Sequence, residues 1–180
     1  MRNTILLSLA AILLSTLLLL GACRSPQGLY LEYFVDEHQP YEEIGYEQLP
    51  DAARAFHDRC HTPDDIEEIY CGHLEDSGKK VYGIVFRDGS EMLFDKNGRC
   101  LQMSNLRDGL PLCWTNQIPL YNVIYRTIEK EMAQMTDKPW EVRILEIKPN
   151  GYLVKTGQGV DITLFFFDKR GRLKDVAYEI

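Results

Sequence analysis

Several motifs that mark enzymes and redox proteins are absent from this chain of 180 residues. It has no Gly-x-Ser-x-Gly around a nucleophilic serine and no Cys-x-x-Cys pair of the thioredoxin kind. A glycine-rich loop that would cradle a phosphate is also missing. Gly157-x-Gly159 comes closest, but predicted strands flank it on both sides, as in a hairpin turn. We therefore expect a protein that is not an enzyme and holds no cofactor.

Basic residues are scarce, because 20 Lys and Arg face 27 Asp and Glu, for a net charge of −7. Proteins bind nucleic acid through Lys and Arg, so the composition argues against a nucleic-acid partner. By the same reasoning, an acidic protein is poorly suited to an anionic membrane surface.

Only one long apolar run is present, from Ile5 to Leu20. It is shorter than the ~20 residues that a spanning helix needs and follows Arg2, as in a secretory signal peptide; a retained helical anchor is the alternative. The run ends in Leu-Gly-Ala-Cys, which resembles the lipobox of bacterial lipoproteins. That resemblance implies a signal peptide at 1–22 and acylation of Cys23. Because Arg24 rather than an aspartate follows, we expect a lipid anchor in the outer membrane, facing the periplasm or the cell surface.

Four cysteines follow the lipobox: Cys60, Cys71, Cys100 and Cys113. An even number in an exported protein indicates disulfides. We expect at least one, with Cys60–Cys71 favoured because a helix end and the following strand can approach closely enough. Buried free thiols are the alternative.

Residues 44–103 follow the pattern of a helix and then four strands. Leu49-Pro50 begins the helix, since proline is favoured in a first turn, and the helix ends before Pro63. Asp88-Gly89 between two apolar runs predicts a two-residue hairpin turn, which places Val85 opposite Met92. The helix should cover the face that these two residues share. The opposite face then carries Tyr82, Ile84, Phe86, Glu91 and Leu93.

The pattern restarts at Ile118-Pro119 after a linker at 104–117. A second helical stripe runs from Tyr121 to Met135, and strands are predicted at 140–147, 152–155, 161–167 and 172–178. We therefore expect an α+β protein of two tandem repeats, each an α-helix packed on a four-stranded antiparallel β-sheet. The repeats would span 44–103 and 118–180, behind a tether at 23–43 that includes an extra strand at 29–35.

This order resembles the beta-lactamase-inhibitor-like, PepSY-like family of exported bacterial proteins. The positions that carry the resemblance are Leu49-Pro50, Tyr82, Phe94-Asp95 with Gly98, Ile118-Pro119, Tyr152, and Phe167-Asp168 with Gly171. The resemblance implies one helix on a four-stranded sheet per repeat and no established enzymatic activity. The family name reflects likeness to an inhibitor that covers an enzyme with the open face of its sheet.

We accordingly expect a non-catalytic protein-binding or inhibitor-like module, with an unidentified envelope protein as partner and the membrane reached through the lipid. The candidate contact face is Tyr82, Ile84, Phe86, Glu91 and Leu93, because large exposed apolar patches mark interaction sites. Packing of the same residues in the core is the alternative. A small-ligand or metal carrier and a structural envelope component are the rival functions.

The metal carrier would depend on five side chains of types that bind zinc: His57, Cys60, His61, Cys71 and His73. A metal site needs three or four ligands in set geometry. The loop at Pro63 separates the three residues of the predicted helix from Cys71 and His73 on the predicted strand. The Phe-Asp-Lys-Asn-Gly segment lacks the glutamate at the twelfth position of a calcium loop, where Leu106 stands. We expect no metal site.

Overall fold

The computed structural model describes residues 42–158 and 161–179. The predicted signal peptide, the acylation site Cys23 and the predicted strand at 29–35 lie outside the described residues. Nine strands are present within them: β1 (Glu42–Glu43), β2 (Ile66–His73), β3 (Lys80–Phe86), β4 (Glu91–Asp95), β5 (Cys100–Ser104), β6 (Glu141–Lys148), β7 (Gly151–Gln158), β8 (Asp161–Asp168) and β9 (Leu173–Glu179).

Three α-helices and two 3-10 helices complete the described part: η1 (Tyr46–Gln48), α2 (Asp51–His57), η2 (Pro63–Asp65), α3 (Leu112–Thr115) and α4 (Tyr121–Met135). None of these helices combines the length and the hydropathy that crossing a membrane requires.

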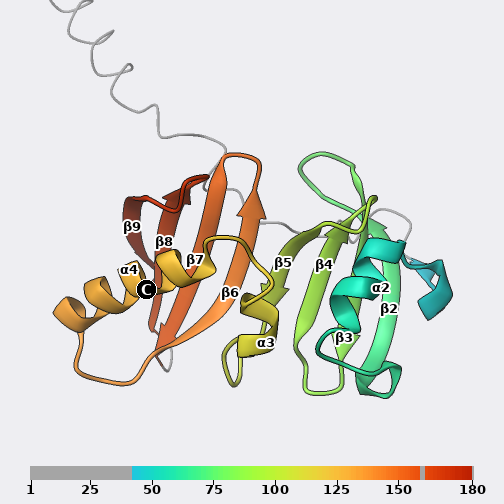
Figure 1. The fold of residues 1–180 in the computed structure, drawn as a ribbon, viewed down its shortest axis with the longest axis horizontal. Coiled ribbons are helices and arrows are strands. Elements are labelled where there is room, and N and C mark those ends of the chain that lie inside the picture. The colour runs from blue at the N-terminus through green and yellow to red at the C-terminus, as the bar shows by residue number, and fades with distance from the viewer. Residues whose placement is uncertain (1–41, 159–160, 180) are drawn as a thin grey trace, which may run out of the picture.

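All nine strands form one antiparallel sheet in which each strand pairs with the next along the chain (Figure 1). The expectation of two four-stranded sheets is therefore wrong. β5 pairs with β6 through Gln102–Glu146, Met103–Leu145 and Ser104–Ile144. Without that ladder β5 and β6 would each present unpaired backbone groups at an edge. Among the described residues the fold is one continuous sheet with α2, α3 and α4 on a single face. We call the opposite side, which carries none of these helices, the helix-free face.

The β3–β4 hairpin differs from the prediction by one residue. The Phe86 amide donates to the Ser90 carbonyl at 2.9 Å, so the loop holds three residues, Arg87, Asp88 and Gly89. Gly89 has a φ of +82°, as in three-residue loops that end in a left-handed residue. Asp88 supports the loop by accepting hydrogen bonds from the amide and hydroxyl of Ser90.

The extra loop residue changes the strand register. Val85 pairs with Glu91, and Ile84 with Met92, instead of Val85 with Met92. A shift of one residue moves every side chain of a strand to the other face. Ile84 and Met92 therefore face the helices together, while Val85 lies on the helix-free face.

One core fills the space between the helices and the sheet and contains residues of both halves of the chain. Its largest fully buried side chains are Trp114, Phe86, Phe94, Phe165, Phe167, Ile84, Met92, Met103, Ile124, Ile128 and Leu145. The shared core is a second reason why the halves are not two separate helix-on-sheet units.

Both predicted helices form, with different lengths. α2 begins after Pro50 and ends at His57, several residues short of the expected end before Pro63. The amides of Cys60 and His61 both bond to the His57 carbonyl, which closes a turn there. α4 buries Tyr121, Ile124, Ile128 and Met132 on one stripe, as the helical spacing predicts. The linker at 104–117 contains the unpredicted helix α3, whose Trp114 is fully buried.

Candidate functional site

The predicted contact face is divided between the two sides of the sheet. Ile84 and Phe86 are 0% and 2% exposed within the main core, and Tyr82 packs half-buried against it. Leu93 and Glu91 lie on the helix-free face. The prediction of one exposed face is wrong, because the three-residue hairpin loop shifts β3 against β4. For Ile84 and Phe86 the alternative prediction, that these side chains pack in the core, is confirmed.

Glu91 is held by a contact on the helix-free face. The hydroxyl of Tyr70 donates to a carboxylate oxygen of Glu91, and burial raises the pKa of that carboxyl group. The Tyr70 ring lies directly over Gly83, its partner across the strands, where any β-carbon would collide with the ring. Tyr70 packs with Leu93 in a second apolar cluster that also contains Leu74 and Val81.

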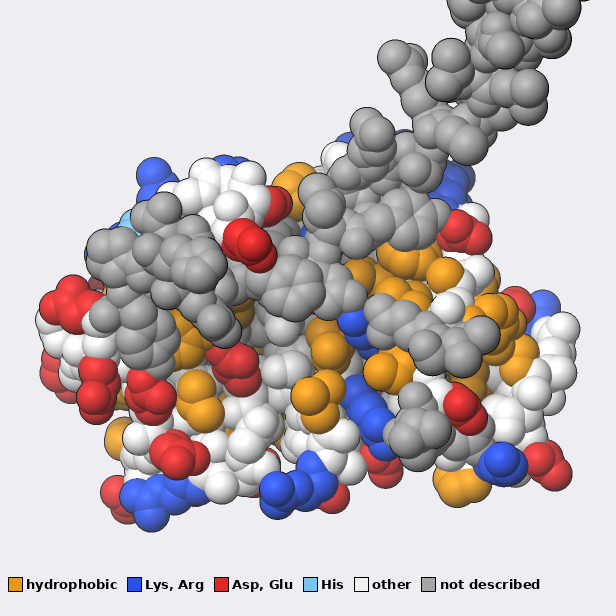
Figure 2. Space-filling model, turned by 180° about the vertical axis from the view of Figure 1, so that it is seen from behind, with side chains coloured by type: hydrophobic (Ala, Val, Ile, Leu, Met, Phe, Trp, Pro, Cys, Tyr) orange, Lys and Arg blue, Asp and Glu red, His pale blue; other side chains and the backbone are white. Residues whose placement is uncertain are grey.

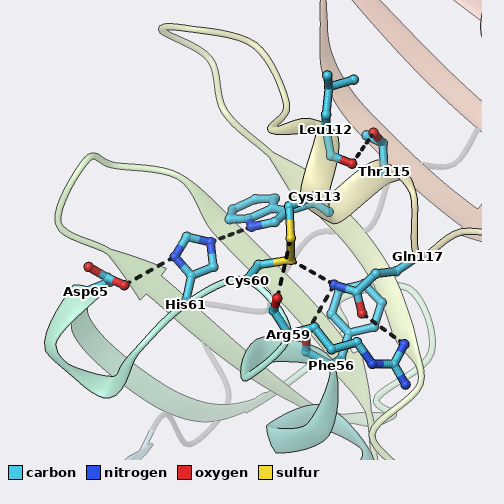
Figure 3. Close-up of a disulfide and its surroundings, with 10 residues drawn as sticks. Phe56, Arg59, Cys60, His61, Asp65, Leu112, Cys113, Thr115 and Gln117 are labelled. Carbon is cyan, nitrogen blue, oxygen red and sulfur yellow. Dashed lines mark hydrogen bonds and ion pairs between the residues drawn. A yellow bond between two sulfur atoms is a disulfide. The ribbon is translucent and has the colours of Figure 1, made fainter.

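Cys60 and Cys113 form a disulfide with a Cα–Cα distance of 5.9 Å (Figure 3). The prediction of at least one disulfide is confirmed, and the favoured pair Cys60–Cys71 is wrong. The segment that carries α3 folds back onto the end of α2 and brings Cys113 there, while Cys71 is buried within β2 as a free thiol. Cys100 is also free, and burial raises the pKa of its thiol to about 12, which argues against a reactive thiolate.

His57 and His61 belong to an aromatic cluster between α2, α3 and β3. Their rings stack at 5.7 Å, and the His61 ring lies 4.5 Å from that of Phe86. Trp114 donates its indole N–H to Nε2 of His61, whose Nδ1 lies 3.5 Å from a carboxylate oxygen of Asp65 (Figure 3). Across the described residues no three His, Cys, Asp or Glu side chains are grouped to hold a metal. The cluster packs the helices onto the sheet.

A pocket opens where β5 and β6 separate. Their ladder stops at Gln102–Glu146, and no β5–β6 pair follows toward that end of the sheet. The register between β4 and β5 also shifts there, leaving Leu101 without a partner on β4. The resulting cavity has a volume of about 380 Å³, within the range of roughly 300–1,000 Å³ that is typical of small-molecule sites.

The pocket has an apolar side and a polar side. The apolar residues are Leu74, Val81 and Leu101, which belong to or pack against the second apolar cluster. The polar residues come from turns of both halves of the chain: Asp76, Ser77, Lys79, Lys80, Asp95, Lys148 and Asn150. Figure 2 shows the helix-free face, with hydrophobic side chains on both halves and Lys and Arg side chains between them.

The charged groups of the pocket are engaged to different degrees. The Lys148 ammonium lies 2.5 Å from a carboxylate oxygen of buried Glu146, and Lys80 lies over the ring of Tyr82 at 5.1 Å. Asp95 accepts hydrogen bonds from two amides of its own turn. Lys79 is an exposed cation at the rim. The pocket can thus offer N–H and O–H donors beside an apolar surface.

Sequence reasoning identified these turns but not their meeting. The residues at 75–78 and at 148–151 both have the polar, Gly- or Pro-containing composition of turns, yet the two segments are about 70 positions apart. Only the pairing of β5 with β6 brings them to one end of one sheet. No local pattern in the sequence signals that pairing.

No protein-family model and no curated protein matches the sequence. Three solved structures are similar to this chain. One is a candidate periplasmic protein of the DUF2874 family from Bacteroides vulgatus, with a TM-score of 0.56 and 22% identity over 76% of this chain and 96% of that chain.

The second is a candidate calcium-regulated periplasmic protein from Bacteroides thetaiotaomicron, with a TM-score of 0.57 and 21% identity over 76% of this chain and 96% of that chain. The third is a candidate periplasmic protein of unknown function from Bacteroides vulgatus, with a TM-score of 0.58 and 19% identity over 77% of this chain and 99% of that chain. Identities this low show a common fold and nothing finer. This chain therefore adopts a fold that it shares with bacterial proteins described as periplasmic.

Proposed function

We propose that this chain is a non-catalytic envelope protein that binds a small amphiphilic anion in the pocket between β5 and β6. The pocket itself carries the proposal, since it joins an apolar surface to a cationic rim. An apolar tail would lie on Leu101, which is only half-buried, in front of the buried Leu74 and Val81. An anionic head would meet Lys79 and the amide of Asn150.

The architecture favours this ligand over a polar anion or a purely apolar one. Val81 is fully buried and Leu74 is 4% exposed, so both form the packed wall behind half-buried Leu101. A tail on Leu101 would leave water for the apolar surface that this wall still exposes. Small-molecule sites commonly combine such a surface with a few polar groups that fix orientation. Three of the five charged residues of the pocket are lysines.

The pocket also supports this function better than an inhibitor-like contact through the predicted face. Ile84 and Phe86, two of the five residues of that face, are buried in the core and are not available to a partner. A protein-binding role would need other contact residues.

Two features support an envelope location. The Leu-Gly-Ala-Cys tetrapeptide supports export and lipid attachment at Cys23, and the similar structures are described as periplasmic. Membership of the PepSY-like family is part of the same proposal. It is supported by Leu49-Pro50 and Ile118-Pro119, which precede α2 and α4 respectively.

Calorimetric titration of the full chain with octanoate tests the proposal, with octyltrimethylammonium as the cationic counterpart of the same tail length. We expect octanoate to bind and the cation not to bind. Ser77→Trp, at the exposed rim, should obstruct the pocket and weaken octanoate binding. Gln134→Trp, on the exposed side of α4, is the matched control and should bind normally. Equal binding of both amphiphiles, or none of either, would overturn the proposal.

A further inference from the structure

Four turns lie together at one end of the sheet. In an antiparallel meander, alternate turns fall at the same end, so the β2–β3, β4–β5, β6–β7 and β8–β9 connections share it. They form the upper end of the sheet in Figure 1. We define the basic end as these turns together with strand residues that border them: 75–80, 95–99, 148–151 and 168–172.

The charge of the described chain is sharply divided between this end and the rest. The basic end contains eight Lys and Arg against four Asp and Glu. The remaining described residues contain ten Lys and Arg against twenty Asp and Glu. Although the whole chain has a net charge of −7, the basic end is therefore positively charged and the rest of the described chain is negatively charged.

Two of the four acids at the basic end are directed into their own turns. Asp95 accepts hydrogen bonds from the amides of Asn97 and Arg99 at 2.8 and 2.9 Å. Asp168 does the same with the amides of Arg170 and Arg172 at 2.9 and 3.0 Å, and these bonds hold the pKa of its carboxyl group well below the usual range.

The cations of the same turns point outward into solvent. Lys96, Lys169 and Arg170 are all exposed. They come from the β4–β5 and β8–β9 turns, so the positive charge extends across both halves of the sheet.

The described chain also enters the fold toward this end. Glu42 pairs with Cys71 and Glu43 with Tyr70, so Glu42, the first described residue, lies on the side of the β2–β3 turn. Eighteen residues, 24 to 41, separate Glu42 from Cys23, a length that reaches at most ~65 Å when fully extended. An acyl group on Cys23 would keep the whole folded part within that distance of a bilayer, so the charge of its surface decides which end faces the lipid.

We infer that the basic end docks on the anionic surface of a lipid bilayer. Each Lys or Arg near such a surface contributes about 1 kcal/mol, while the acidic remainder of the chain is repelled and fixes the orientation. The bilayer also matches the way the positive charges are spread across four turns rather than gathered around one pocket. The exposed cations that carry the docking, Lys96, Lys169 and Arg170, do not line the proposed ligand pocket. Lys79 and Lys148 belong to both regions, so the test of docking uses only the first three.

Hydrogen exchange of the full chain in vesicles tests the inference. An acyl chain would insert into any bilayer, so the readout is local protection rather than total binding. Vesicles of phosphatidylethanolamine with phosphatidylglycerol should slow exchange in 95–99 and 168–172 by about fivefold or more relative to phosphatidylcholine vesicles. Raising the salt from about 0.1 M to 1 M, which shortens the Debye length from ~10 Å to ~3 Å, should remove that protection.

Two matched triple variants distinguish an effect of the basic end from an effect of the net charge of the protein. Lys96→Glu, Lys169→Glu and Arg170→Glu together should abolish the protection. Arg126→Glu, Lys130→Glu and Lys138→Glu, all exposed on or just after α4, change the net charge equally and should retain it. The β3–β4 hairpin at the opposite end should exchange alike in both kinds of vesicle. The inference is overturned by equal exchange in both vesicles, by equal effects of the two triples, or by protection that only a soluble anionic polysaccharide induces.

Discussion

Gly98 lies so close to the first turn of α2 that a β-carbon built on it would come within 2.6 Å of the Ala53 amide nitrogen. Gly171 ends the corresponding turn beside α4 with a similar backbone, since the φ angles are +77° and +73°. A β-carbon on Gly171 would stay 3.6 Å from the nearest atom, Cβ of Leu120. The two positions therefore differ mainly in clearance.

This difference predicts unequal costs for the same substitution. Gly98→Ala should reduce the free energy of unfolding by about 2–5 kcal/mol, from left-handed strain and overpacking together. Gly171→Ala should cost about 1–2 kcal/mol, from strain alone. Urea unfolding of both variants measures the difference. Equal losses would mean that the β4–β5 turn does not press on α2.

Phe86 is expected to act through stability. Its ring packs against Trp114 at 5.2 Å and His61 at 4.5 Å, so Phe86→Ala should cost about 3–5 kcal/mol. Tyr82→Ala should cost less, because Tyr82 is half-buried. Thermal melts test both variants. A Phe86→Ala protein that melts like the wild type would return this side chain to the surface and restore the predicted docking face.

The disulfide makes a separate contribution. Cys113→Ser should lower the free energy of unfolding by about 2–5 kcal/mol, because the bond joins positions 53 residues apart. Cys100→Ser removes a cysteine that forms no disulfide and serves as the control. Alkylation of the unfolded, unreduced protein should label Cys71 and Cys100 but not Cys60 or Cys113. Label on all four would contradict the pairing.

His61 predicts a pH dependence of stability. Burial, and then the nearby His57, lower its pKa from 6.5, against the opposing effects of Asp65 and Asp88. The unfolded chain therefore binds more protons than the folded chain below about pH 6.5, and stability falls as the pH falls. Protonation of Nε2 would also end the hydrogen bond that Trp114 donates.

The comparison variant is His61→Gln, whose amide oxygen can still accept from Trp114. Between about pH 6.5 and 5, the wild type should lose more unfolding free energy than the variant. Urea titrations at a series of pH values, followed by Trp fluorescence, give both curves. Parallel curves would remove His61 as the source of the dependence.

Much of the local structure could be predicted from spacing alone. The strand predicted at 140–147 is β6, that at 161–167 is β8, and the stripe after Tyr121 is α4. These elements depend on periodic apolar residues and nearby prolines, which are visible in the sequence. Which side chains of β3 point toward the helices depends instead on whether the β3–β4 loop holds two residues or three. The sequence Asp-Gly occurs in loops of both lengths, so it does not decide between them.

The candidate pocket could not be predicted, because it results from long-range pairing. The β5–β6 ladder and the Cys60–Cys113 bond each join the two halves of the chain. The burial of Trp114 could not be predicted either. Its neighbours in the sequence, Gly109, Pro111 and several polar residues, are typical of a linker, yet its side chain is fully buried in the core.

The Cys60–Cys113 bond also determines what proteolysis can do. The connection from β5 to α3 is the exposed stretch between the halves, and Leu106 in it is 63% exposed. A protease that cut there would leave Cys60 on one fragment and Cys113 on the other. The two fragments would stay covalently joined and would separate on a denaturing gel only after reduction, so a nicked molecule would keep its single sheet and core.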